Sequence, residues 1–407
     1  MLESVLSFFL RNWVIILFYL GVIALIYLNR KKFEFQGKII ALYRTKVGIA
    51  FMERLSKKSP EFFKLVGYIG IGLGFLGMFV ITFLLVANIP RIITSTQPVE
   101  GVTPVLPGVR IPWSSFYLPL LEGIIAIFIV ASVHEFSHGL IAKAHNLKIK
   151  STGIMFLGPI FGAFVEPDEK ELEKQPDVVQ YSVFVAGPLS NVILALVVVL
   201  VMGYALMPLL TAMSVPVGFS LSEVIPDQPA YLGGVRPDVV FTEFNGNRTE
   251  TGMAFFDALQ KITPNQELML KDREGNVYHF TAGVNPDDPE RGYFGIRLSD
   301  SLGRPAIKDE REVKSTILPY NLFYQFIMFL HSFFYIVQLL SLGIGLANLM
   351  PIGPFDGGRM IKVSLQKLFG TKRGDTYWKQ VSFVVLFVLA VNLFIPMIRW
   401  IIEQIPF

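Results

Sequence analysis

The chain has 407 residues, of which 52% are hydrophobic, 13% aromatic and only 17% charged, whereas an ordinary globular protein has about 25% charged residues. The mean hydropathy is +0.52 and the net charge is +4, from 36 Lys and Arg against 32 Asp and Glu. This balance predicts a polytopic membrane protein and excludes a disordered or collagen-like chain. The chain has no cysteine, which excludes a disulfide framework, a Cys-ligated zinc or iron–sulfur site and a Cys nucleophile.

Long apolar runs predict about six transmembrane helices, because a helix needs roughly 20 mostly apolar residues to cross a bilayer. The first run is followed by Arg30, Lys31 and Lys32 and has no small-residue cleavage site, so we interpret it as a retained anchor rather than a signal peptide. The second contains closely spaced glycines, which favour close helix packing in lipid. The predicted spans are residues 12–29, 65–87, 119–142, 178–213, 316–350 and 381–398.

The charges of the connecting segments orient these spans. Residues 30–62 hold nine Lys or Arg, whereas residues 90–115 hold only Arg91 and Arg110. The excess of basic residues in cytoplasmic loops places both termini outside and the basic loops in the cytoplasm. The basic isoelectric point is therefore a sign of membrane topology, and we expect no nucleic-acid partner.

Residues 214–314 differ from the rest of the chain in composition. Short alternating runs at 239–244, 267–270 and 277–282 are separated by turn residues such as Asn245-Gly246, a hairpin signal. Residues 255–261 are typical of a short amphipathic helix. We expect an inserted α+β domain that lies outside the cytoplasm.

The third predicted span carries a chemical motif, His134-Glu135-Phe136-Ser137-His138. Residues four apart on a helix are separated by about 40° around the axis and about 6 Å along it, so both imidazoles can reach one ion. Glu135 lies beside them, where it can take a proton from water. A carboxylate and two imidazoles within an apolar span are costly and point to function.

A catalytic zinc usually takes three protein ligands, and without cysteine the third must be His, Asp or Glu. Glu122 lies about 18 Å away along the same helix and cannot serve, and Glu166 is a weak candidate. Asp356 is the better one, because it follows the cytoplasmic end of the fifth span in a segment rich in Pro and Gly. We expect residues 351–358, with their prolines and glycines, to break the helix there.

Three motifs in this order resemble the site-2 proteases, the intramembrane zinc metalloproteases of regulated intramembrane proteolysis. His134, Glu135 and His138 match the family's first motif, and Ala186-Gly187-Pro188 with Asn191 match its second. Asn348 and Pro351, followed by Phe355-Asp356-Gly357, match the third, with Phe355 where Leu is common.

The resemblance implies one Zn²⁺ per chain, bound by His134, His138 and Asp356, with Glu135 as the catalytic base and then acid. It implies that Asn348 binds the substrate or the oxyanion, and we assign Asn191 to helix packing. The expected activity is cleavage of transmembrane segments of membrane-anchored substrates.

The insert resembles a PDZ domain of the circularly permuted bacterial type. Pro229-Ala230 with Gly233, and Gly292 to Ile296, are similar to PDZ segments, although Pro237 replaces the usual Gly. Such a domain binds peptide termini; the alternative is an insert that only screens bulky substrates. Gly and Pro punctuation near 151–170 indicates a re-entrant hairpin that offers a strand edge to an unwinding substrate, and a passive cytoplasmic loop is the alternative.

Together these expectations describe an integral protein of a prokaryotic plasma membrane, with termini and PDZ-like domain outside and the active site toward the cytoplasm. The rival functions are a prenyl-protein-type membrane zinc protease, whose third ligand is Glu, and a non-catalytic PDZ-bearing scaffold or metal transporter. The expected parts are residues 1–115 (two spans and a basic loop), 116–213 (core spans three and four), 214–314 (PDZ-like domain), 315–360 (core span five) and 361–407 (basic loop and last span).

Overall fold

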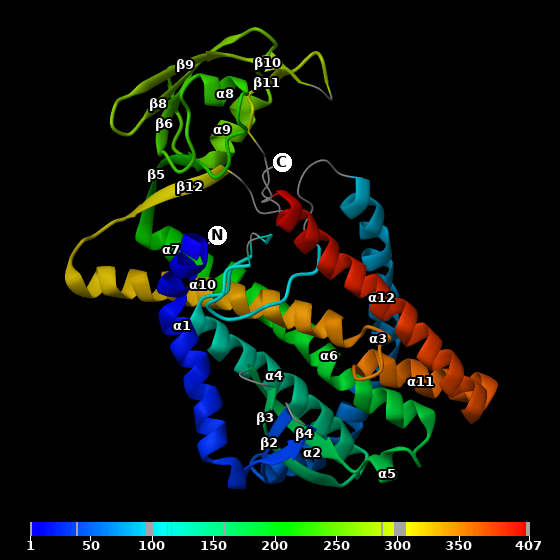
Figure 1. Cartoon of the computed structure of the whole chain (residues 1–407). Helices are drawn as coiled ribbons and strands as arrows, with labels where there is room; N and C mark the ends of the chain where they lie inside the picture. The colour runs from blue at the N-terminus through cyan, green and yellow to red at the C-terminus, as the bar shows by residue number, and fades with distance from the viewer. Residues whose placement is uncertain are drawn as a thin grey trace. The chain divides into compact units, whose positions relative to one another are not determined.

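A computed structural model describes residues 2–37, 40–94, 101–111, 113–114, 116–157, 160–285, 288–296 and 307–403 (Figure 1). The chain divides into two compact units. The membrane unit comprises Met1–Met202 and Ser332–Phe407, and the insert unit comprises Gly203–His331.

Long helices and one small sheet build the membrane unit. Its helices are α1 (Leu2–Leu28), α2 (Ile49–Lys58), α3 (Pro60–Thr94), α4 (Leu120–Ala144), α5 (Glu169–Leu172), α6 (Asp177–Val201), the greater part of α10 (Leu318–Asn348), α11 (Asp356–Phe369) and α12 (Thr371–Glu403), with a 3₁₀ turn at Arg30–Lys32. A π-helical turn, Met202–Leu206, joins α6 to α7 (Met207–Met213).

In the part of the chain that the structure describes, five helices are long and apolar enough to cross a membrane. They are α3, α4, the run Asp177–Met213, α10 and α12. The sixth predicted span falls in α1, whose apolar part, Trp13–Leu28, is shorter. The chain is thus a polytopic helical membrane protein, and the count of six stays a prediction.

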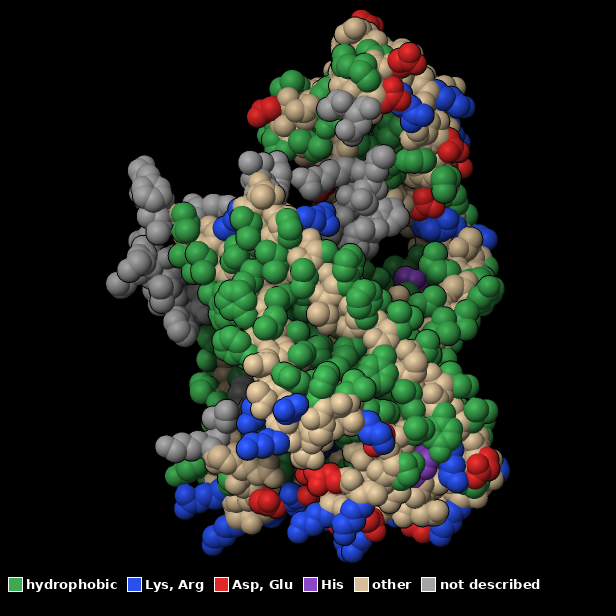
Figure 2. Space-filling model, turned by 90° about the vertical axis from the view of Figure 1, so that its right-hand side faces the viewer, with side chains coloured by type: hydrophobic (Ala, Val, Ile, Leu, Met, Phe, Trp, Pro, Cys, Tyr) green, Lys and Arg blue, Asp and Glu red, His purple; other side chains and the backbone are tan. Residues whose placement is uncertain are grey.

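The surface of the membrane unit matches this composition. Figure 2 shows hydrophobic side chains covering the helices in a broad band, while Lys and Arg gather at the lower end, where Figure 1 draws α2 and α5. Exposed apolar residues such as Phe79, Phe83 and Leu196 are about half exposed or more. Such a surface suits lipid, because bilayer tails are as apolar as these side chains.

Glycines on one face of α3 allow α6 to approach closely. A Cβ on Gly67, Gly70 or Gly74 would lie 2.9 Å from Ser182, 2.8 Å from Leu189 and 2.5 Å from Val185, respectively. Gly72 lies on a different face of α3, where nothing lies within 4 Å of its Cβ position. The predicted role of this glycine-rich span in helix packing is therefore confirmed for one face only.

A four-stranded antiparallel sheet packs beside α4, in the order β1 (Glu34–Gln36), β2 (Ile40–Thr45), β3 (Ile149–Leu157) and β4 (Ile160–Pro167). The predicted hairpin near 151–170 is present as β3 and β4, although its turn at 158–159 lies outside the described residues. Strands β1 and β2 extend this hairpin and were not predicted. Among the described strands, β4 pairs only with β3, so its other edge is open.

The insert unit contains a main antiparallel sheet, a two-stranded sheet β10-β11, and short helices, with α7 and the start of α10 at its ends. Its elements are β5 (Ser214–Leu221), α8 (Pro229–Leu232), β6 (Phe241–Phe244), β7 (Asn247–Arg248), α9 (Gly252–Leu259), β8 (Glu267–Asp272), β9 (Val277–Thr281), β10 (Gly283–Val284), β11 (Gly292–Tyr293) and β12 (Ile307–Val313). The main sheet has the order β12-β5-β6-β8-β9. The predicted Asn-Gly hairpin joins β6 to β7, with Asn245 and Gly246 both at positive φ.

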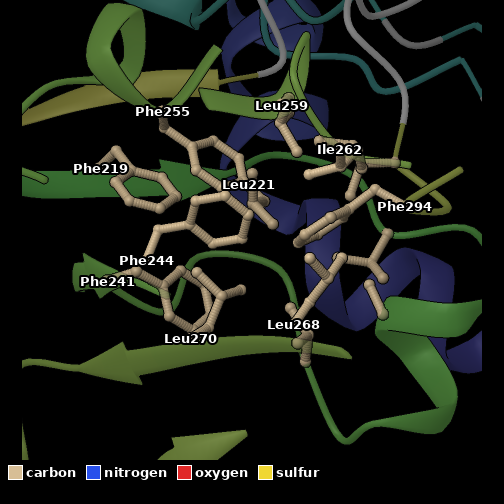
Figure 3. Packing of buried hydrophobic residues seen from close by; sticks show 14 of the residues in the cluster. Phe219, Leu221, Phe241, Phe244, Phe255, Leu259, Ile262, Leu268, Leu270 and Phe294 are labelled. Carbon is tan, nitrogen blue, oxygen red and sulfur yellow. The ribbon is translucent and has the colours of Figure 1, made fainter. Parts of the chain in front are cut away.

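Aromatic side chains fill the core of the insert unit (Figure 3). The Phe219 and Phe255 rings stack with centroids 4.1 Å apart, and Phe244 meets Phe255 edge to face at 5.1 Å. All three are almost fully buried. Strand β8 shows the predicted period of two, because Leu268 and Leu270 are buried and alternate with more exposed neighbours.

The α3–α6 contact generates a matched pair of substitutions. Gly74→Ala places a methyl group 2.5 Å from Val185, and such overpacking costs about 1–3 kcal/mol. Gly72→Ala meets no atom within 4 Å and should leave stability unchanged or slightly raised. Thermal unfolding of both variants in detergent tests this; equal midpoints would show that the glycine face does not set the helix spacing.

Candidate metal centre

Helix α4 places two imidazoles on one face. His134 and His138 lie one turn apart with ring centroids 4.8 Å apart, and both are buried. Their Nε2 atoms are 3.1 Å from each other. Glu135 lies beside them, and the ligand atoms of all three residues lie within 4.8 Å of one another.

Asp356 reaches this pair from the other end of the sequence. Its Oδ2 is 3.1 Å from Nε2 of His134 and 3.3 Å from Nε2 of His138. The carboxylate belongs to the first residue of α11, which begins after the irregular segment 349–355. The structure thus brings Asp356 to the two histidines, although it lies 222 residues after His134 in the sequence.

The expected helix break is correct for residues 351–355 but wrong for Gly357 and Gly358, which lie in the first turn of α11. A Cβ on Gly357 would lie 2.1 Å from the Leu349 carbonyl oxygen, and a Cβ on Gly358 would lie 2.0 Å from that of Ile352. These glycines therefore let the helix start against the preceding loop. Close backbone approach, and not a broken helix, explains the Asp-Gly-Gly sequence.

The three ligand atoms fit a tetrahedral zinc ion. Zinc bound at about 2.0–2.1 Å in a tetrahedron holds its ligand atoms about 3.3 Å apart, close to the 3.1–3.3 Å separations here. Gly187 of α6 closes the site: a Cβ there would lie 2.4 Å from both Nε2 atoms. A side chain on Gly187 would fill the space in which an ion must sit.

Each imidazole has a second partner at its far nitrogen. Nδ1 of His138 is 2.7 Å from the carbonyl oxygen of Val183, to which it can donate. Donation from Nδ1 leaves the lone pair of Nε2 free for a metal. A backbone carbonyl oxygen has two lone pairs, so Val183 can accept this hydrogen bond in addition to one within α6.

Asn191 takes the same position beside His134. Its Nδ2 is 3.1 Å from Nδ1 of His134, and its Oδ1 is buried without a hydrogen-bond partner among the described residues. Because the two ends of an amide are interchangeable in shape, half a turn brings Oδ1 to Nδ1 as an acceptor. Ser341 Oγ donates to the backbone carbonyl oxygen of Asn191 at 2.7 Å. Asn191 thus contacts a proposed ligand in addition to the packing role expected for it.

Glu135 accepts a hydrogen bond from strand β4. The backbone N–H of Val165 donates to Oε2 of Glu135 at 2.9 Å. This N–H lies on the open edge of β4, so the carboxylate occupies the position that a neighbouring strand would take. A backbone donor leaves no signature in a sequence, and the contact was not predicted.

The other residues singled out from the sequence make their hydrogen bonds outside this cluster. Asn348 donates from Nδ2 to the Ile344 carbonyl of its own helix at 3.0 Å, so its role in substrate binding stays a prediction. Glu166 is engaged by Arg44 and Ser151. Glu122 lies in the first turn of α4, and His145 contacts Ser182 at 3.2 Å.

Comparison with known proteins gives one family. The model of peptidase family M50 matches residues 122–391. An uncharacterised protein of Methanocaldococcus jannaschii is 29% identical over 326 residues, which cover 79% of this chain and 76% of that protein. The zinc metalloprotease RasP of Oceanobacillus iheyensis is 27% identical over 224 residues, which cover 46% of this chain and 50% of RasP.

The position of Gly187 predicts a loss of metal binding. Gly187→Ala puts a methyl carbon 2.4 Å from both Nε2 atoms, so we expect zinc affinity to fall at least about tenfold. Gly343→Ala is the control, because nothing lies within 4 Å of that Cβ position on α10. Metal content by elemental analysis checks both variants; full zinc occupancy in Gly187→Ala would rule out this geometry.

Proposed function

This chain belongs to peptidase family M50, the site-2 proteases, and from this membership we propose that it is an intramembrane zinc endopeptidase. Its substrates would be membrane-anchored proteins cut within a transmembrane segment. The observation that carries the proposal is the meeting of His134, His138 and Asp356 beside Glu135 in a unit of long apolar helices. The relative named zinc metalloprotease RasP supports it.

We assign His134, His138 and Asp356 as the ligands of one Zn²⁺ per chain. When bound, zinc would supply Lewis acidity to the scissile carbonyl and to the attacking water. The Nδ1 contacts with Asn191 and Val183 would keep both imidazoles in the tautomer that leaves Nε2 free.

Glu135 would act first as base and then as acid. Its carboxylate takes a proton from water as the water oxygen bonds to the carbonyl carbon. It then gives the proton to the amide nitrogen as the C–N bond breaks, so the products are an amine and a carboxylic acid that keeps the second water proton. The hydrogen bond from Val165 to Oε2 leaves Oε1 to face the water.

The open edge of β4 would hold the substrate. A helical peptide bond is shielded by its own hydrogen bonds, so the substrate must unwind before water attacks. An extended segment can pair with the outward backbone groups of Phe161 and Ala163, which alternate with inward ones and share the edge with Val165. Asn348, whose amide has a second N–H besides the one given to Ile344, would contact the substrate or its oxyanion.

Charge supports the proposed orientation. The basic end of the membrane unit (Figure 2) would face the cytoplasm, which agrees with the predicted topology, with both termini and the insert unit outside in a prokaryotic plasma membrane. The antiparallel sheet and short helices of the insert unit support a PDZ-like domain for peptide termini or for screening substrates by size.

The mechanism predicts a clean separation of metal binding from catalysis. Glu135→Gln should retain zinc, since the three ligand atoms are untouched, and should lower cleavage of a detergent-solubilised transmembrane peptide by at least about a thousandfold. Glu122→Gln, on the same helix but in its first turn, is the matched control. Cleavage by Glu135→Gln at the wild-type rate would make this mechanism wrong.

A second prediction separates the M50 assignment from a prenyl-protein-type protease, whose third ligand is Glu. Asp356→Ala should abolish zinc binding, because it removes one of three ligands. Glu122→Ala and Glu166→Ala should retain the metal. Zinc retention in Asp356→Ala with loss in either Glu variant would favour the rival enzyme, and a scaffold would keep its cellular activity after zinc chelation.

A further inference from the structure

Arg44 joins all four strands of the sheet beside α4. From β2, its Nε donates to Glu34 of β1 at 2.6 Å and its Nη1 donates to Ser151 of β3 at 2.7 Å. Nη1 also pairs with Glu166 of β4, and Ser151 donates to the same Glu166 oxygen at 2.6 Å. The hydrogen bond to Glu34 and the charge of Glu166 raise the pKa of Arg44 above its ordinary value, so the guanidinium remains charged.

The register of the sheet makes this reach possible. Arg44 pairs with Gly153, and Gly153 pairs with Phe164 on β4. A Cβ on Gly153 would lie 2.8 Å from the Phe164 ring. Because Gly153 has no side chain, the ring lies across β3 and the guanidinium carbon sits 5.7 Å from its centroid. Arg44 therefore contacts β4 at two positions on one face, Phe164 and Glu166.

The residue between these two positions is Val165. Its N–H is the donor to Glu135, and its side chain lies toward α4, where a Cβ on Gly139 would be 3.0 Å from Val165 Cγ1. Arg44 thus holds Phe164 and Glu166 on one face of β4, while Val165 between them contacts the catalytic helix.

These contacts matter because β4 is an edge strand. Among the described strands, β4 has a partner only on the β3 side, so no second ladder fixes the position of the Val165 N–H. Edge strands are the part of a sheet most easily displaced. The hydrogen bonds of Arg44 connect β4 to the other strands of the sheet. Arg44 itself lies before residue 122, where the match to the M50 family begins.

We propose that Arg44 is a positioning residue for Glu135, acting through Glu166 and the Val165 N–H of strand β4. The inference rests on the proposed peptidase function. Loss of the network would let β4 shift, loosen the Oε2 contact and misplace the base, while the zinc ligands on α4 and α11 stay in place. Small displacements of a reacting group cost large factors in rate, so the effect should fall on kcat.

The test compares Arg44→Ala with Arg44→Lys, Glu166→Gln and the Arg44→Ala/Glu166→Gln double variant in the full-length zinc-loaded protein. Lys46→Ala is the control, because Lys46 is an exposed basic residue that directly follows β2. Two measurements are made: hydrogen exchange of the peptide covering residues 160–167, and kcat and KM for a transmembrane peptide, with zinc content and thermal midpoint recorded for each variant.

We expect Arg44→Ala to raise exchange across residues 160–167 and to lower kcat about tenfold, with KM within about twofold and zinc unchanged. Arg44→Lys should restore part of both losses, and the double variant should be no worse than the worse single one, since the residues act as a unit. Lys46→Ala should match the wild type.

Unchanged exchange at residues 160–167 in Arg44→Ala would overturn the inference, as would a raised KM with an unchanged kcat, or a loss of zinc that accounts for the loss of rate. The hydrogen-exchange measurement alone tests whether Arg44 stabilises β4. Absence of cleavage by the zinc-loaded wild type would instead count against the proposed function, so the two failures are distinguishable.

Discussion

Polar atoms inside an apolar helical unit must satisfy one another, and this constraint organises the metal centre. Burying a charged or hydrogen-bonding group without a partner costs several kcal/mol. Here Asp356 meets both imidazoles, His138 meets the Val183 carbonyl, and Glu135 meets the Val165 N–H. The helices therefore cannot shift past one another without leaving one of these groups unpaired, so the same contacts that arrange the ligands also fix the packing.

The sequence is sufficient to predict those parts of the site that lie within one element or one motif. The i, i+4 spacing of His134 and His138 predicts a shared face, and the basic loops predict that Asp356 is at the same depth. The distances of 3.1 and 3.3 Å from Asp356 to the two imidazoles agree with both expectations. Hydropathy locates the long helices, because period and length are properties of local sequence.

What could not be predicted comes from contacts between backbone and distant side chains. The groups concerned are the backbone N–H of Val165 and the backbone carbonyl of Val183. Almost every residue type has the same backbone groups, so these contacts leave no pattern in the sequence. Strands β1 and β2 are short and sit in a segment whose basic charge indicated only a loop. Gly357 and Gly358 suggested a helix break because glycine is a poor helix former, whereas close approach to the Leu349 and Ile352 carbonyls decides the matter.

The pairing of β2 with β3 has a consequence for dividing this protein into parts. Residues 40–45 form a continuous ladder with residues 152–157. A fragment trimmed to the peptidase-matched region would keep both histidines and the aspartate but would bare a long row of unpaired amides and carbonyls on β3. Such a row is a template for another chain. The smallest fragment that remains soluble in detergent should therefore begin before Glu34, and a fragment trimmed at the family boundary should aggregate.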